Sequence, residues 1–180
     1  RHEDTIQQFW TQAFVEGPRM TDVDIYVLTS SYTFSGAEEF SYNMKNLERG
    51  TLVGETTGGG AHPVGMHIFP ELNLGIRVPY GRAINPISGT NWEGVGVEPD
   101  IKVPADQALD RALQEAYKKL LDKEDLDPDS RADIEWAKAT LDRKHDPLEL
   151  DEELLKSYAG RYGPRTITYE DGELIYQREG

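Results

Sequence analysis

The sequence contains no cysteine, and this absence excludes several kinds of chemistry at once. Without thiols the chain has no disulfide framework, no thiolate metal site and no cysteine nucleophile. Disulfides are the usual sign of an oxidising environment, so their absence leaves the redox compartment open.

Long hydrophobic runs are also missing from the chain. The longest apolar stretches, such as residues 25–28, are far too short to span a bilayer, and residues 1–10 lack the apolar core of a signal peptide. We therefore expect a soluble segment without membrane insertion. Apolar spacing over residues 5–14 predicts a helix that starts without an initiating methionine, so we expect an excised or processed piece of a longer protein.

Positive charge is scarce: 19 Lys and Arg residues stand against 33 Asp and Glu residues, which gives a formal net charge of -14. Such a surface repels phosphate backbones and anionic membranes, so nucleic acid is excluded as a partner. The 180 residues, 37% of them hydrophobic, are enough for one main core with a small appendage.

The first half of the chain has the pattern of an α/β protein. A β-branched, apolar run over residues 23–30 predicts a buried strand, and helical spacing follows over residues 34–47. Strand character returns over residues 51–57, and residues 64–69 and 74–78 predict a hairpin.

The second half is predicted to be mainly helical. After a Gly- and Pro-rich loop over residues 80–91 and a short strand at 101–103, residues 105–121 and 130–143 predict two helices. We place a domain boundary at Asp146, which gives domains of residues 1–146 and 147–180.

The tail after this boundary is predicted to be a small α+β appendage. It contains a helix over residues 151–158 and a β-hairpin of strands 165–169 and 173–177. Two strands alone are marginally stable, so this tail must pack on another element.

Ser35 stands where a strand has ended and a helix begins, and two interpretations fit it. In the first, Ser35 and Glu38 form a capping box, each side chain accepting a hydrogen bond from the other's backbone N–H. In the second, the Ser35 hydroxyl is a nucleophile beside unpaired helix-start N–H groups, and the Gly36 N–H stabilises an oxyanion.

Three motifs carry a resemblance to a known family. The run LTSSYTFSGAEEF at 28–40, LVGETTGG at 52–59 and WEGVGVEPD at 92–100 resemble the tail-specific, or C-terminal processing, protease family. The resemblance implies a ClpP/crotonase-like core of ββα units, of which residues 1–146 are the C-terminal, nucleophile-bearing part. The family also includes the repeats of the interphotoreceptor retinoid-binding protein.

The resemblance also suggests which base the serine uses. In the bacterial processing proteases a lysine about two dozen residues after the serine deprotonates it, but here that neighbourhood is GGGAH at 58–62. Lys45 lies midway along the predicted helix and should point away from its start. The tricorn-like branch uses a histidine instead, oriented by a glutamate that Glu93 matches.

That histidine comes from a region before the nucleophile strand, which this chain does not contain, so the fragment alone is expected to be inactive. His62 and His67 are local alternatives as base, although a histidine in such a loop or strand is more often a simple surface residue. Glu93 without the resemblance would be a solvated loop carboxylate, and Asp100 a structural turn residue.

The glycine-rich turn is predicted to lie beside a substrate groove. We assign substrate binding to Thr57, Gly58 and Gly59. An extended peptide would pair with the strand at 51–57 or with the following hairpin.

The predicted function is that of a serine endopeptidase or C-terminal processing peptidase, with Ser35 and Glu93 catalytic, Gly36 in the oxyanion hole, and no metal or cofactor. The alternative is a noncatalytic module that binds retinoids or fatty acids. The resemblance implies export to the periplasm or cell envelope and a peptide or protein substrate. The oligomeric state stays open.

Overall fold

The computed structural model describes residues 12–146 and 149–178 of a mixed α/β protein. The chain divides into two compact units, Arg1–Ala105 and Asp106–Gly180. No helix within the described ranges combines the length and apolar character that crossing a bilayer would need.

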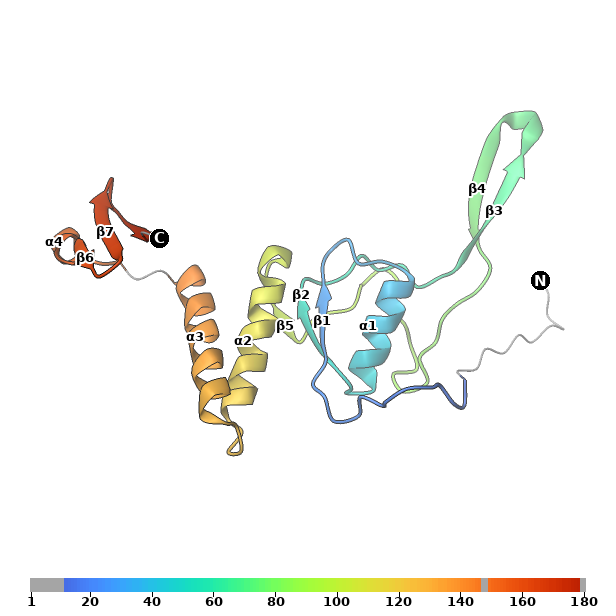
Figure 1. The fold of residues 1–180 in the computed structure, drawn as a ribbon. Coiled ribbons are helices and arrows are strands. Elements are labelled where there is room, and N and C mark those ends of the chain that lie inside the picture. Colours follow the sequence, from blue (N-terminus) through green and yellow to red (C-terminus); the bar gives the residue numbers. More distant parts are fainter. Residues whose placement is uncertain (1–11, 147–148, 179–180) are drawn as a thin grey trace. The chain divides into compact units, whose positions relative to one another are not determined.

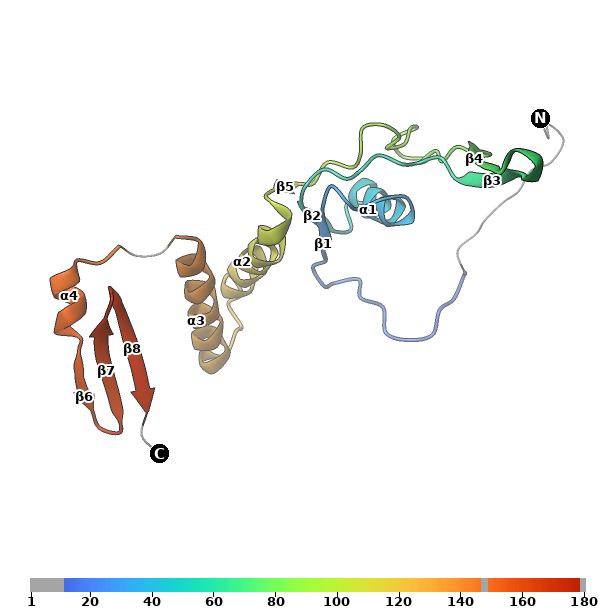
Figure 2. The ribbon, with the colours of Figure 1, turned by 90° about the horizontal axis from the view of Figure 1, so that it is seen from above.

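A three-stranded parallel sheet forms the centre of the first unit. Its order is β1-β2-β5, with β1 at Tyr26–Thr29, β2 at Thr51–Gly54 and β5 at Ile101–Lys102. Parallel neighbours need a crossover connection, and helix α1 (Gly36–Asn46) supplies it between β1 and β2. Figures 1 and 2 show α1 beside these two strands.

The core of this unit lies where the central strand meets two loops. Leu52 of β2 is fully buried and clusters with Ala61, Trp92 and Val97, each at most 6% exposed. The Tyr42 ring on α1 packs against Trp92 with ring centroids 5.2 Å apart. The hydrophobic effect therefore fixes the glycine-rich turn and the 92–97 segment against the helix that follows Ser35.

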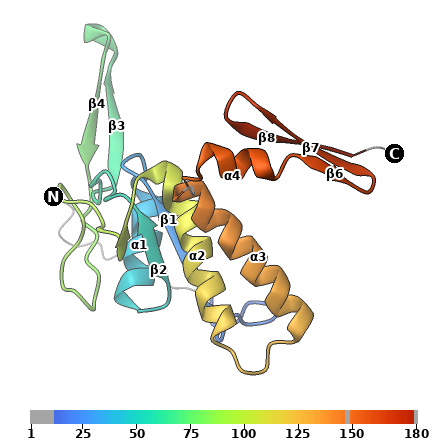
Figure 3. The ribbon, with the colours of Figure 1, turned by 90° about the vertical axis from the view of Figure 1, so that its left-hand side faces the viewer.

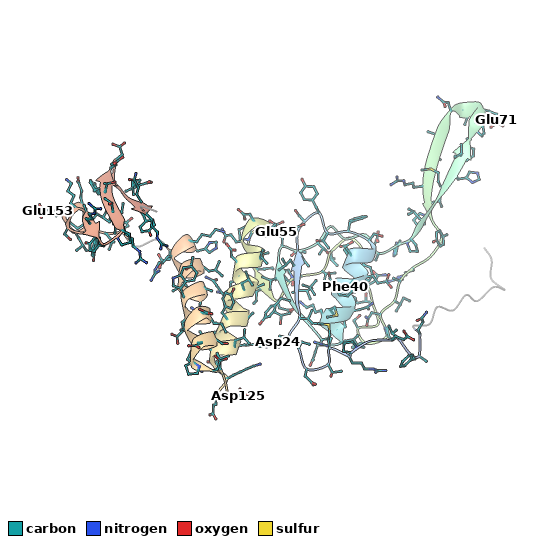
Figure 4. The ribbon with its side chains drawn as sticks, viewed as in Figure 1. Asp24, Phe40, Glu55, Glu71, Asp125 and Glu153 are labelled. Atoms are coloured by element: carbon teal, nitrogen blue, oxygen red, sulfur yellow. The ribbon has the colours of Figure 1, made fainter. Side chains whose placement is uncertain are left out.

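Polar contacts at the carboxyl end of β2 fix the loop after β1. Glu55, labelled in Figure 4, accepts a hydrogen bond from the Ser31 N–H at 3.0 Å. Its second oxygen accepts one from the Ala105 N–H at 3.3 Å. Glu55 thus ties the loop that leads to Ser35, and also Ala105 at the end of the first unit, to the carboxyl end of β2.

A separate hairpin follows the glycine-rich turn. Strands β3 (Val64–Phe69) and β4 (Leu74–Pro79) pair antiparallel, joined by the short helix η1 (Pro70–Leu72), and Figure 4 labels Glu71 in the connection. This element agrees with the prediction from alternating residues. Its apolar side chains are solvent-exposed in the described structure: Val64, Met66, Ile68, Leu74, Ile76 and Val78.

Two helices dominate the first part of the second unit. After the short helix η2 (Ala105–Gln107), α2 (Ala108–Leu121) and α3 (Pro128–His145) lie side by side in Figures 1 and 3. Asp127 caps α3 by accepting the Ser130 N–H at 2.9 Å.

The tail contains helix α4 (Glu152–Ser157) and an antiparallel sheet of order β6-β7-β8. The sequence predicted α4, β7 (Arg165–Glu170) and β8 (Glu173–Arg178) but missed β6 (Gly160–Tyr162). Three residues are too few to show a period of two, so β6 left no signal. The domain boundary at Asp146 stays a prediction.

The predicted N-terminal helix falls mostly outside the described residues, since 5–11 belong to the undescribed start. Residues 12–14 are not helical. The predicted strand at 23–30 is shorter than expected and begins only at Tyr26.

We predict that Leu52→Ala destabilises the protein by about 2–5 kcal/mol, because a fully buried leucine loses its contacts and leaves a cavity. The control Leu72→Ala, at a side chain that is 71% exposed, should change stability by no more than about 0.5 kcal/mol. Urea unfolding followed by tryptophan fluorescence measures both, and equal effects would contradict the assigned core.

Candidate active site

Ser35 occupies a strained backbone position at the start of α1. Its φ of 55° and ψ of -120° lie in a region that favours glycine, and its side chain is exposed. A non-glycine residue held in such a conformation costs about 1–3 kcal/mol and persists only where its surroundings fix it. Strain of this kind is concentrated at functional sites.

The donors beside Ser35 are not equivalent. The Ser35 N–H is already bonded, at 2.8 Å, to Oε2 of Glu38. The Gly36 N–H belongs to the first helical turn, which has no intrahelical acceptor, and it makes no hydrogen bond to another described residue. A Cβ at Gly36 would meet nothing within 4 Å, so the Cα of this residue is not enclosed by neighbouring atoms.

The capping box predicted at this helix is present in outline. Glu38 accepts the Ser35 N–H, and the Ser35 hydroxyl occupies the reciprocal position at the Glu38 N–H without reaching hydrogen-bond geometry. Ser35 remains exposed in this arrangement, so the structural and chemical interpretations of Ser35 are compatible.

Glu38 is the polar centre of the site, although its side chain is fully buried. Besides the Ser35 N–H it accepts the Gly60 N–H at 2.8 Å, the Gly59 N–H at 2.6 Å and the Thr57 hydroxyl at 2.5 Å. Burial raises the pKa of this carboxyl, but these four hydrogen bonds outweigh it and lower the pKa below the usual 4.5. Glu38 is thus held ionised.

The glycine-rich turn packs against Phe34, the residue before Ser35. A Cβ at Gly60 would lie 2.2 Å from the Phe34 ring, and one at Gly58 would lie 2.8 Å from it. The lack of side chains at these positions therefore lets the turn approach the Ser35 loop closely.

Glu93 faces the same turn. Its Oε2 accepts the Ala61 N–H at 2.7 Å and the His62 N–H at 3.1 Å. Two carboxylates thus hold consecutive amides, since Glu38 binds the N–H of Gly60 and Glu93 that of Ala61. The structure brings the predicted acid to the turn that is tied to Ser35.

The two candidate histidines differ in their surroundings. His62 Nδ1 lies 3.7 Å from Glu93 Oε1, and His62 Nε2 is buried with no hydrogen-bond partner in the part of the chain that the structure describes. His67 lies on β3 with its ring edge-on to Phe69. Only His62 is near Glu93 among these two.

Thr57, Gly58 and Gly59, the predicted substrate-binding residues, have N–H groups that are bonded within the chain. Their acceptors are Val97 O, Thr33 O and the Glu38 carboxylate. A substrate-binding role for these residues stays a prediction, and it cannot rest on these donors.

The expected pairing of a peptide with the strand at 51–57 needs a correction. Strand β2 lies between β1 and β5 and is paired with both, so it has no free edge for another strand. The hairpin β3–β4 is paired on one side only in each strand within the described structure, so its edges remain available.

Asp100 has a structural role, as predicted, and it lies beside Lys45. Lys45 Nζ donates to the Glu98 carbonyl at 2.6 Å and lies 3.1 Å from Asp100 Oδ1. The other Asp100 oxygen accepts the Leu52 N–H at 2.9 Å. These contacts direct Lys45 away from the helix start.

The role of Glu38 as acceptor for the glycine turn was not foreseen from the sequence. The available signal was a glutamate three residues after the serine, combined with consecutive glycines after the next strand. The described residues contain no group of three or more His, Asp or Glu side chains arranged to hold a metal ion.

Comparison with known proteins identifies the family. Residues 2–103 match the family model of Peptidase family S41. The chain is a member of peptidase family S41. This agrees with the resemblance seen in the three sequence motifs, and the matched range contains Ser35, Glu38 and Glu93.

The curated relative that this chain matches is much longer than the chain. A protein of Sulfurisphaera tokodaii named as a Tricorn-like protease C-terminal subunit is 33% identical over 110 residues, which cover 55% of this chain and 13% of that protein. The chain therefore corresponds to a small part of this relative.

Two solved structures of proteases are also similar. The photosystem II D1 C-terminal processing protease is 25% identical over 47% of this chain and 22% of its own, with a TM-score of 0.41. Mature CPAF is 26% identical over 47% of this chain and 17% of its own, with a TM-score of 0.36. Scores this low do not define the fold.

We predict that Ser35→Gly is more stable than Ser35→Ala by about 1–3 kcal/mol, because glycine accepts the φ of 55° without strain. Both variants lack the hydroxyl, so the comparison isolates the backbone. Denaturant unfolding at neutral pH measures the difference, and equal stability would show that position 35 is not strained.

A pH dependence follows from the lowered pKa of Glu38. A carboxyl with a lowered pKa in the folded state stabilises the protein above its unfolded-state pKa, and this stabilisation is lost as the pH falls through the folded-state pKa. The stability difference between the wild type and Glu38→Gln should therefore be largest at neutral pH and shrink below about pH 4.5. Urea midpoints of both proteins at several pH values test this, and a constant difference would contradict it.

Proposed function

We propose that this chain supplies the nucleophile of a serine peptidase that cleaves peptide bonds by acyl transfer. The observation that carries the proposal is the strained, exposed Ser35 beside the unbonded Gly36 N–H. A hydroxyl and a free backbone donor at one helix start supply a nucleophile and an oxyanion site together. Membership of peptidase family S41 supports the same chemistry.

In the proposed reaction, Ser35 Oγ attacks the substrate carbonyl while a histidine base takes the hydroxyl proton. The carbonyl oxygen becomes an oxyanion, which accepts a hydrogen bond from the Gly36 N–H. The peptide C–N bond then breaks, the histidine gives its proton to the leaving amine, and water hydrolyses the ester on Ser35. Glu93 orients the histidine throughout.

We assign the base to a histidine outside this chain, which would approach Glu93 from another part of a longer protein. The length of the curated relative supports this assignment, because this chain covers only 13% of it. His62, at 3.7 Å from Glu93, is the alternative within the chain.

The proposed substrates are unstructured protein tails, and the complete catalytic domain would have a ClpP/crotonase-like fold. An extended peptide could pair with a free edge of the β3–β4 hairpin, where backbone hydrogen bonds bind it with little sequence dependence. Kinship supports export to the periplasm or cell envelope.

The experiment is labelling of the full-length protein by a fluorophosphonate probe, in which Ser35 Oγ bonds to phosphorus and fluoride leaves. We expect stoichiometric labelling of the wild type and none of Ser35→Ala. Glu93→Gln should label at least about 10-fold more slowly, because the base loses its orienting charge.

Three outcomes would count against parts of this proposal. An unlabelled wild type that binds retinoids or fatty acids saturably would favour the binding module. Labelling that disappears in His62→Gln but persists in His67→Gln would identify His62, within this chain, as the base. A folded protein that lacks residues 147–180 and no longer labels would give the tail a catalytic role.

A further inference from the structure

The Glu38 carboxylate connects the nucleophile to the rest of the site. It is fully buried, and each of its two oxygens accepts two hydrogen bonds. We infer that Glu38 is a positioning residue that holds Ser35 in its strained conformation and leaves the Gly36 N–H as the oxyanion donor. This inference rests on the proposed function of Ser35.

The strain at Ser35 requires a restraint close to its own peptide group. Glu38 Oε2 accepts the Ser35 N–H at 2.8 Å and the Gly60 N–H at the same distance. A single oxygen therefore fixes the nucleophile's backbone against the glycine turn. Without this acceptor, the Ser35 backbone could relax to a negative φ, and its hydroxyl would move with it.

The same bond decides which amide can meet an oxyanion. The Ser35 N–H points at a buried carboxylate, so it is not available to a substrate. The next donor along the helix start, from Gly36, makes no hydrogen bond within the described part of the chain, and Gly36 is exposed. Glu38 thus selects one donor by occupying the other.

A carboxylate suits this position better than an amide. All four partners are donors, namely three backbone N–H groups and the Thr57 hydroxyl. A glutamine can accept through only one oxygen, and its NH₂ group would face two of these donors. Glu38→Gln keeps the size of the side chain but breaks half of the hydrogen bonds.

The network reaches the segment that carries Glu93. The Thr57 hydroxyl donates to Glu38 and accepts the Val97 N–H at 2.7 Å. The Gly94 N–H donates to the Gly59 carbonyl at 2.9 Å. The next amide along the chain, the Gly60 N–H, donates to Glu38 Oε2, which also accepts the Ser35 N–H. Loss of Glu38 should therefore disturb both the nucleophile and the placement of the acid.

The test compares two neighbouring glutamates in the full-length protein. Glu38→Gln should lower the second-order rate of fluorophosphonate labelling at least about 100-fold, comparable with the loss of an oxyanion donor. Glu39→Gln, on the exposed side of the same helix turn, should label within about twofold of the wild type. Circular dichroism at a temperature well below each melting midpoint confirms that the compared proteins are folded.

A second pair of variants covers the case in which Glu38→Gln does not fold. Thr57→Val removes one donor to Glu38 and should slow labelling, whereas Thr57→Ser keeps the hydroxyl and should retain most of the rate. Equal labelling of these two folded variants would overturn the inference.

A strain measurement separates positioning from a general structural role. The gain in melting temperature of Ser35→Gly over Ser35→Ala should shrink in a Glu38→Gln background, because the restraint on φ is gone. An unchanged gain, or a folded Glu38→Gln that labels as fast as the wild type, would overturn the inference. If the wild type itself does not label, the proposed function fails instead.

Discussion

The site depends on one buried negative charge that would be unstable by itself. Removing a carboxylate from water is unfavourable unless hydrogen bonds replace its hydration. Glu38 meets this requirement with the Ser35 N–H and with donors from Thr57, Gly59 and Gly60 in the turn after β2. Because these donors come from two segments that are distant in sequence, residues 35–38 and 57–60 must fold together around the charge. The strained backbone conformation of Ser35 persists only because these surrounding contacts hold it.

The hydrophobic core and this polar centre reinforce each other. Trp92 packs beside Leu52, and its indole N–H donates to the Gly60 carbonyl at 3.1 Å. One side chain therefore joins the apolar cluster to the turn whose amides bind Glu38 and Glu93. The contacts of Trp92 thus fix the groups that in turn hold Glu38 and Glu93.

Local patterns in the sequence predicted most of the helices and strands and the position of Ser35 at the start of α1, while its catalytic role stays a prediction. The apolar spacing that predicts α1, β3 and β4 is a property of neighbouring residues, so it can be read without a structure. The partners of Glu38 could not be predicted in this way, because Thr57 and Gly60 are 19 and 22 residues distant. A capping box is a sufficient local explanation for a Ser-x-x-Glu motif, so there was no reason from sequence to expect that Glu38 also binds residues of the turn after β2. The free edge of β2 was also misjudged, since β5 pairs with it from 47 or more residues away.

The contact between Phe34 and the glycine turn has a consequence for how such sites can diversify. The aromatic ring occupies the volume into which a side chain at position 60 would grow, with 2.2 Å left for its first carbon. In this backbone, a side chain at position 60 therefore requires the Phe34 ring to move aside or to be replaced by a smaller group. The size and placement of residue 34 thereby limit which side chains the turn can carry at position 60.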